Sequence, residues 1–248
     1  MVVVFYYKII PITSYPQPHT SYLLSKNKIM ISFTEENYLK IIYKLSAETD
    51  NEISTNAVAE LTQTKAASVT DMLRKLSEKQ LVSYQKYQGV RLTKEGQNLA
   101  LKVIRKHRLW EVFLVDKLGF NWDEVHEIAE ELEHINSEEL VQRLDEFLGF
   151  PQCDPHGDPI PDCNGRMPEL GYKNLSEIEE KQTVIMMGVS QHSTNFLQYL
   201  AKIGLNLGIS IEVIEINDFD KSLTIKIGGN NSCFLSYEVA KNLLVKVF

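Results

Sequence analysis

The placement of proline is the feature that most limits how this chain of 248 residues can fold. All eight prolines lie in two windows, residues 11–18 and residues 151–168. Proline fixes φ and lacks a backbone N–H, so it interrupts helices and the interior of sheets. Long regular elements are therefore expected in residues 19–150 and 169–248, and the second proline window predicts a linker between them.

Five segments follow from this pattern and from local changes in period. Residues 1–29 are predicted to be a disordered or mis-annotated tail, and we hypothesise that translation begins at Met30. Helix-forming patterns divide into residues 30–93 and 94–150. A proline-rich linker is predicted at 151–172, and a small module with strand-like alternation at 173–248.

Composition excludes several classes of protein. Apolar residues make up 44% and charged residues 24%, which is typical of a globular domain. No run approaches the roughly 18 apolar residues of a membrane span, so no membrane partner is expected. Three cysteines without a CxxC pair favour a reducing cytoplasm. A net charge of −7 excludes a uniformly basic nucleic-acid protein but leaves room for a local basic patch.

Residues 34–93 carry the pattern of three short helices followed by a hairpin. Apolar residues recur at i, i+3, i+4 and i+7 in two stretches, 38–45 and 69–76, as on one helix face. Ser54 or Thr55 is expected to cap a short helix between them, and Thr64 the third helix. Two β-prone runs flank Gln88-Gly89 within residues 81–92. This order predicts a winged helix-turn-helix, whose third helix enters the major groove of DNA.

Charge supports that interpretation locally. Residues 65–94 hold seven basic side chains against two acidic ones. Phosphate neutralisation supplies most non-specific DNA affinity, so an acidic protein would keep its DNA face here. The competing interpretation is a solvated amphipathic helix of no special function. The predicted DNA contacts are Lys65, Ser68, Thr70, Arg74, Lys86 and Arg91.

The rest of the chain predicts more helices and then a β module. A long helix is expected from about Lys94 to Lys117, then helices at about 122–135 and 137–148. Alternation in 209–213 and 223–227 predicts a hairpin, with further strands at 183–188 and 244–248 and a helix at 194–203. The expected fold class is mainly α with a small β-barrel module.

An acidic stretch carries the strongest chemical signal. Residues 122–146 hold ten acidic side chains and a single basic one. Clustered carboxylates are costly to desolvate unless a cation lies among them. Mixed imidazole and carboxylate ligands suit Mn(II), Fe(II), Co(II) or Zn(II). Helical spacing is expected to place on one face His126, Glu130, Glu133 and His134, and on the face of the preceding helix His107 and Glu111.

Other interpretations of these residues compete with a metal centre. A solvated acidic helix with incidental histidines is the plainest alternative. A metallohydrolase is a second, since HEIAE at 126–130 is one residue short of HExxH. Cys153, His156 and Cys163 are interpreted as part of a structural loop rather than zinc ligands, and His192 as a surface residue.

Several runs carry a family likeness: ENYLKIIY (36–43), SVTDM (68–72), RKHRL (105–109), VH (125–126), EELEH (130–134) and PHGDPIP (155–161). With them, residues 31–162 resemble the diphtheria-toxin-repressor family of metal-dependent transcriptional regulators, most of all its manganese transport regulators. Residues 173–248 are similar to the SH3-like FeoA-type module of many members.

The resemblance implies a homodimer with a winged-helix domain, a helical dimerisation domain and a C-terminal SH3-like barrel. It implies a repressor of metal-uptake genes that binds a palindromic operator in double-stranded DNA, with the metal as allosteric co-repressor. A DNA-binding regulator that ignores metals is the alternative within the same fold.

The resemblance also implies two neighbouring metal sites. One uses Glu130, Glu133 and His134 with a first-helix residue, here Asn37, where the family usually has Asp or Met. The other uses His107, Glu111 and His126. Lys40 stands where one manganese branch has a bridging Glu, which disfavours that binuclear geometry. Glu130 replaces the Cys of iron-sensing members, which favours Mn(II) over Fe(II), with Zn(II) or Co(II) able to substitute.

Overall fold

The computed structural model describes residues 30–49, 51–86, 88–229 and 231–247. The expectations for the tail at residues 1–29 lie outside the described residues. Where the chain is described, its elements are confirmed as mainly helical, with a sheet module at the C-terminal end.

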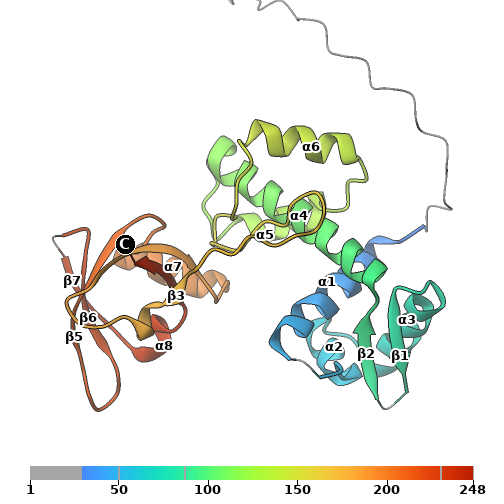
Figure 1. Ribbon diagram of the computed structural model, residues 1–248, viewed down its shortest axis with the longest axis horizontal. Coiled ribbons are helices and arrows are strands. Elements are labelled where there is room, and N and C mark those ends of the chain that lie inside the picture. Colours follow the sequence, from blue (N-terminus) through green and yellow to red (C-terminus); the bar gives the residue numbers. More distant parts are fainter. Residues whose placement is uncertain (1–29, 50, 87, 230, 248) are drawn as a thin grey trace, which may run out of the picture. The chain divides into compact units, whose positions relative to one another are not determined.

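The first part is a three-helix unit with a hairpin (Figure 1). Its elements are α1 (Phe33–Glu48), α2 (Thr55–Leu61), α3 (Ala66–Glu78), β1 (Val82–Gln85) and β2 (Gly89–Leu92). The two strands pair antiparallel, with Ser83 opposite Arg91. This order of elements is the predicted winged helix-turn-helix.

Capping explains where these helices begin. The Ser32 hydroxyl accepts from Glu35 N–H, and the Glu35 side chain accepts from Ser32 N–H, which closes a capping box before α1. Ser54 caps α2 as expected. The prediction that Thr64 caps α3 is wrong: the N-cap is Lys65, without a side-chain bond, and the Thr64 hydroxyl lies 2.8 Å from that of Thr62.

Helix α4 (Lys94–Leu118) connects the hairpin to the remaining helices. Its first turn packs closely against the start of the hairpin: a Cβ at Gly96 would lie 1.9 Å from the Leu81 carbonyl oxygen. It ends at Gly119, whose φ of 74° is the left-handed conformation that favours glycine. Neither this helix nor any other in the described ranges has the length and apolar character to cross a membrane.

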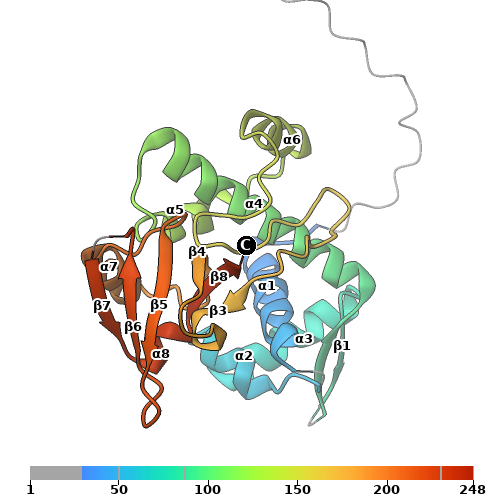
Figure 2. The same ribbon diagram turned by 60° about the vertical axis from the view of Figure 1, so that its left-hand side comes forward.

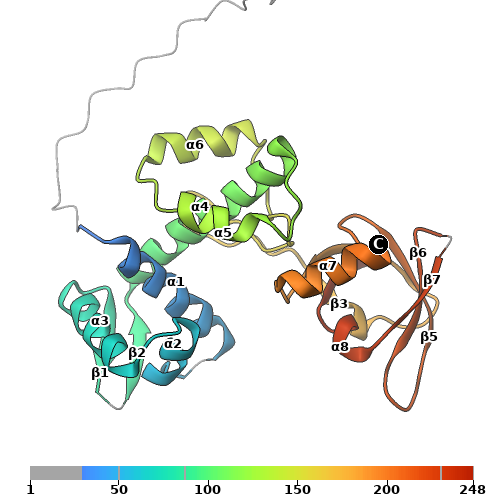
Figure 3. The ribbon, with the colours of Figure 1, turned by 180° about the vertical axis from the view of Figure 1, so that it is seen from behind.

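Helices α5 (Val125–Leu132) and α6 (Glu138–Phe147) follow, and α5 lies along α4 in Figures 1 and 3. The helix predicted for residues 122–135 is shorter at both ends. Glu133 is its C-cap, and the chain turns where Ile135 N–H donates to the Leu132 carbonyl. Of His126, Glu130, Glu133 and His134, which were expected to share one helix face, only His134 therefore lies beyond the helix and its cap.

The linker packs against α4 through two arginines. Arg105 donates to the Pro161 carbonyl at 2.5 Å, and Arg108 donates to the Pro159 carbonyl. Arg108 also contacts the Asp158 carboxylate at 3.1 Å. These bonds hold residues 154–161 next to the middle of α4, where His107 and Glu111 lie.

The C-terminal module is a six-stranded antiparallel sheet of order β3-β8-β4-β5-β6-β7 (Figure 2). The predicted hairpin is β5 paired with β6, with Val213 opposite Ile225. Residues of α7 and α8, such as Leu200 and Ala240, share its apolar core. The elements are β3 (Lys173–Asn174), the 3-10 turn η1 (Leu175–Glu177), β4 (Thr183–Val189), α7 (Thr194–Ile203), β5 (Ser210–Ile216), β6 (Leu223–Ile227), β7 (Asn231–Leu235), α8 (Tyr237–Ala240) and β8 (Leu243–Val247).

Candidate metal centre and nucleic-acid interface

Glu133 lies at the centre of a cluster built from three helices. Its side chain is fully buried, and its carboxylate contacts Lys40 Nζ of α1 at 2.7 and 2.8 Å. The same carboxylate lies 2.7 Å from His107 Nδ1 of α4. Glu133, the C-cap of α5, therefore contacts both α1 and α4. We call Lys40, His107, Glu130, Glu133 and His134 the Glu133 cluster.

Helix α1 contacts two further members of this cluster. Lys40 Nζ lies 2.6 Å from Glu130 Oε1, and Glu36 Oε2 lies 2.6 Å from His134 Nδ1. The His134 ring stacks on Phe33 at 4.5 Å, and its Nε2 lies 3.9 Å from Glu133. Glu36 and Lys40 are one helical turn apart, so one face of α1 faces the residues around Glu133.

Asn37 lies on α1 between these two contact residues. Its side-chain Oδ1 is buried and has no hydrogen-bond partner within the described ranges. A buried acceptor without a donor is costly, because it has lost its hydrogen bonds to water. A cation would satisfy that oxygen, so the residue fits a metal site on this face of α1.

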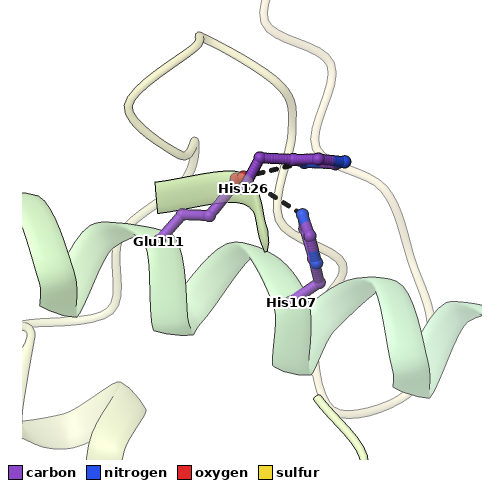
Figure 4. Close-up of side chains that lie close together, drawn as sticks. All are labelled: His107, Glu111 and His126. Carbon is purple, nitrogen blue, oxygen red and sulfur yellow. Dashed lines mark hydrogen bonds and ion pairs between the residues drawn. The ribbon is translucent and has the colours of Figure 1, made fainter. Parts of the chain in front are cut away.

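Glu111 forms a second cluster with the two histidines expected to share it. Figure 4 shows both imidazoles turned toward its carboxylate. Glu111 Oε1 lies 3.1 Å from His107 Nε2 and 3.5 Å from His126 Nδ1. The two nitrogens of the His107 ring therefore face different neighbours: Nδ1 faces Glu133 and Nε2 faces Glu111. Ligand atoms of His107, Glu111 and His126 all lie within 4.8 Å of one another, as do those of His107, Glu130 and Glu133.

The linker adds a third group that sequence reasoning missed. Glu111 Oε2 lies 3.5 Å from His156 Nδ1, and ligand atoms of Glu111, Asp154 and His156 lie within 4.8 Å of one another. His192, expected at the surface, is half-buried with its ring 5.1 Å from that of His156. Spacing could not reveal this group, since α4 and the linker meet only in the fold. The sequence feature that could have indicated this group is the PHGDPIP run at 155–161, which contains His156.

Charge in these clusters is balanced by internal cations. Burial lowers the pKa of His107, but hydrogen bonds to Glu111 and Glu133 outweigh it and raise the pKa to about 9. The pKa of His156 is also raised to about 9, because its contact with Glu111 outweighs the effect of burial. Burial and the nearby Glu111 carboxylate raise the pKa of Asp154 to about 7. Burial raises the pKa of the Glu111 carboxyl, but its three histidine neighbours hold it well below the ordinary range.

The predicted DNA contacts lie on and around α3. Lys65 and Ser68 are exposed at its start, and Arg74 is exposed beside Asp71 at 3.3 Å. Thr70 and Lys86 line one groove of about 430 Å³ between the N-terminal ends of α2 and α3 and the hairpin. Arg91, on β2, lies 3.7 Å from Glu52. The structure thus brings Thr70 and Lys86 to one groove and leaves Arg74 further along α3.

A winged helix joined to buried imidazole–carboxylate clusters defines a metal-responsive DNA-binding protein. Comparison with family models agrees. Residues 30–90 match the N-terminal DNA-binding domain of iron-dependent repressors, and residues 93–162 match their metal-binding and dimerisation domain. Residues 173–247 match the FeoA domain.

Individual relatives extend over most of the chain. The iron-dependent repressor IdeR of Mycobacterium tuberculosis is 36% identical over 227 residues, covering 86% of this chain and 96% of that protein. The diphtheria toxin repressor of Corynebacterium jeikeium is 28% identical over 162 residues, 65% of this chain and 67% of that protein.

Solved structures of metal-dependent repressors also resemble this chain over most of its length. A manganese-dependent transcriptional repressor in complex with manganese superposes with a TM-score of 0.75 at 35% identity, covering 86% of this chain and all of that one. ScaR with bound Zn²⁺ gives a TM-score of 0.68 at 35% identity, covering 86% of this chain and 99% of that one. The chain belongs to the iron-dependent repressor family.

Proposed function

We propose that this chain is a metal-dependent transcriptional repressor of metal homeostasis, with Mn(II) as its co-repressor and Fe(II) as the second choice. One observation carries the proposal. Helix α1 of the DNA-binding unit and residues 130–134 of the metal-binding unit share one buried polar cluster. A ligand held there would link the two units directly.

The first metal site would use four side chains around Glu133. Asn37 would contribute its buried Oδ1, Glu130 and Glu133 their carboxylates, and His134 its imidazole, whose Nε2 lies 3.9 Å from Glu133. This donor set holds oxygen and nitrogen without sulfur, which favours Mn(II) or Fe(II) and permits Zn(II) or Co(II). Its relatives include an iron-dependent repressor and a manganese-dependent repressor, which supports this range of metals.

A second metal position would use Glu111. Its Oε1 faces His107 and His126, and its Oε2 faces His156 beside Asp154. One carboxylate therefore touches the predicted ligand pair and the linker group. His107 contacts both clusters, so ligation at one position would rearrange the hydrogen bonds at the other.

A divalent cation bound in the Glu133 cluster supplies a charge-dense link between α1 and residues 130–134. Asn37 would then hold α1 in a fixed orientation to the dimerisation unit. In a homodimer this would set two recognition helices about one DNA turn apart, roughly 34 Å, for a palindromic operator. Exposed apolar side chains on and next to α6, such as Phe147 and Phe150, support a dimer contact there.

The alternatives receive less support. A metallohydrolase needs a general base beside the metal, and the family is one of transcriptional regulators. A metal-independent regulator would leave the buried Asn37 Oδ1, which has no hydrogen-bond partner among the described residues, unexplained. A cytoplasmic location, expected from the three cysteines, stays a prediction, and all three thiols are free in the structure.

The test starts by selecting DNA from a random library with the Mn(II)-loaded protein. The enriched operator is then titrated with the full chain at one fixed salt concentration, with Mn(II), Fe(II), Zn(II) or a chelator. Fixed salt matters because phosphate contacts make affinity steeply dependent on ionic strength. We expect Mn(II) to tighten operator binding about 5–150-fold, the usual range of allosteric coupling. Equal binding with chelator would favour the metal-independent regulator.

A further inference from the structure

Lys40 occupies the space between the two carboxylates proposed as metal ligands. Its Nζ lies 2.6 Å from Glu130 Oε1 and 2.7 and 2.8 Å from the two oxygens of Glu133. Its side chain is only 17% exposed, and that of Glu133 is fully buried. The three donors of an ammonium are thus matched by three carboxylate oxygens.

We propose that Lys40 is a built-in competitor of the metal: its ammonium neutralises Glu130 and Glu133 in the metal-free protein and must leave before a divalent cation can be ligated there. Lys40 would thereby set the metal concentration at which the repressor loads. This inference rests on the proposed function, because it requires the Glu133 cluster to be a metal site.

Two physical arguments exclude joint occupancy by both cations. First, all three carboxylate oxygens already accept hydrogen bonds from Lys40 Nζ, so they are not free to ligate a metal. Second, a dication bound to those oxygens would stand within a few ångströms of the ammonium, where like charges repel strongly in a poorly solvated site. The compact ammonium on its flexible stem can swing away, which a shorter side chain could not do.

Glu36 gives a second, independent observation of the same kind. Its Oε2 holds His134 Nδ1 at 2.6 Å, and its Oε1 lies 3.8 Å from Lys106 Nζ of α4. One face of α1 therefore offers a cation to the ligand carboxylates and an anion to the ligand imidazole. In the metal-free protein, side chains of α1 therefore pair with the proposed ligands. Metal binding would replace these pairs by metal–ligand bonds.

The consequence is a metal affinity below what the ligands alone would give. Separating a buried ion pair is costly, and the incoming cation has to meet that cost. Without the ammonium, Glu130 and Glu133 would attract the metal unopposed. Removing the charge of Lys40 should thus tighten metal binding, although it removes a contact from the protein.

The first experiment compares variants by calorimetric titration of Mn(II) into chelator-treated full chain without DNA, at fixed pH and salt. We expect K40M to bind Mn(II) roughly tenfold more tightly, because no buried ion pair then has to separate before the metal binds. K40R keeps the charge and should bind close to wild type. The matched control is K102M, because Lys102 is 58% exposed and pairs with exposed Glu138.

The site of the effect is fixed by a second background. In His134→Ala the gain from K40M should disappear, since the ligand set around Glu133 is then incomplete. An unchanged or weaker Mn(II) affinity in K40M would overturn the proposal. So would a gain of the same size in the His134→Ala background.

A measurement on the wild-type chain covers the case in which K40M folds poorly. Lysine acetylation by a small active ester is followed residue by residue with mass spectrometry, in chelator and in saturating Mn(II). Displacement predicts that Mn(II) speeds labelling of Lys40 severalfold relative to Lys102. An unchanged or slower rate at Lys40 would contradict displacement.

The outcomes also separate this inference from the proposed function. If wild type shows no Mn(II) site that depends on His134, both fail together. If wild type binds Mn(II) and its operator affinity depends on it, while K40M and the labelling rate show no effect, only the role of Lys40 fails.

Discussion

The DNA face of α3 and the Glu133 cluster differ in how their residues are held. On α3 the basic side chains stand in solvent, and Arg74 is 58% exposed with one weak neighbour on its own helix. In the Glu133 cluster the hydrogen-bond partners Lys40 and His107 come from two other helices, and the Glu133 carboxylate is fully buried. The first surface is organised by one helix, the second by the packing of three.

Substitutions in these two regions should therefore have different consequences. A contact on α3 can be removed without disturbing the fold, because water replaces it. A contact in the Glu133 cluster leaves a charged partner unpaired in the interior. Substitutions on α3 should therefore affect only DNA binding, while those in the cluster should affect metal, coupling and stability together.

The largest effect is expected for the metal-free stability of Glu133→Ala. The substitution leaves Lys40 and His107 without their shared carboxylate, so the free energy of unfolding should fall by about 3 kcal/mol. Urea denaturation in chelator measures it. The matched control is Glu138→Ala, whose exposed pair with Lys102 should contribute less than about 0.5 kcal/mol. Equal losses in both variants would remove the contrast between cluster and surface.

The second effect concerns coupling. His134→Ala deletes a proposed ligand, so Mn(II) should no longer tighten operator binding, a loss of about 1–3 kcal/mol of coupling. Titration of the selected operator with and without Mn(II) measures it. Glu127→Ala, exposed on α5, should keep the full response. A His134→Ala protein with an undiminished response would rule out this site.

The third effect is a pH dependence of Mn(II) binding. With a pKa of about 9, His107 is protonated at pH 7 and must lose its proton to ligate. Mn(II) affinity should therefore rise with pH towards 9, about tenfold per unit for one proton, and fall as the solution becomes more acidic.

Titrations at pH 7 in buffers of different ionisation enthalpy count the released protons. His107→Gln should abolish the release from this group. His192→Gln should not alter it, because burial lowers the pKa of His192. A release that is the same in wild type and His107→Gln would contradict the role of His107.

The smallest effect is expected on α3. Arg74→Ala should weaken operator binding by about 1 kcal/mol, with and without Mn(II), and reduce the salt slope by about one ion. Mn(II) affinity should stay unchanged. Arg143→Ala is the matched control, an exposed arginine paired along its own helix, α6. Unchanged operator affinity in Arg74→Ala would move the DNA face elsewhere.

The same contrast explains what the sequence could predict. The helices around α3 and the hairpin follow from local periodicity, so their order was anticipated, although α3 is capped at Lys65 and not at Thr64. The end of α5 was not, because the turn after Leu132 has no proline or glycine to mark it. Pairing of Glu36 with His134, of Lys40 with Glu133 and of His156 with Glu111 depends on the packing of separate segments, which spacing along one helix cannot show.

The most direct test of the account is reciprocal linkage between metal and DNA. If the metal acts by orienting the DNA-binding unit, operator DNA must tighten Mn(II) binding by the same factor by which Mn(II) tightens operator binding. Measuring the Mn(II) affinity of the full chain with and without saturating operator gives that factor. If the metal is an allosteric co-repressor, equal factors of about 5–150-fold are expected in both directions. An Mn(II) affinity unaffected by operator would contradict it.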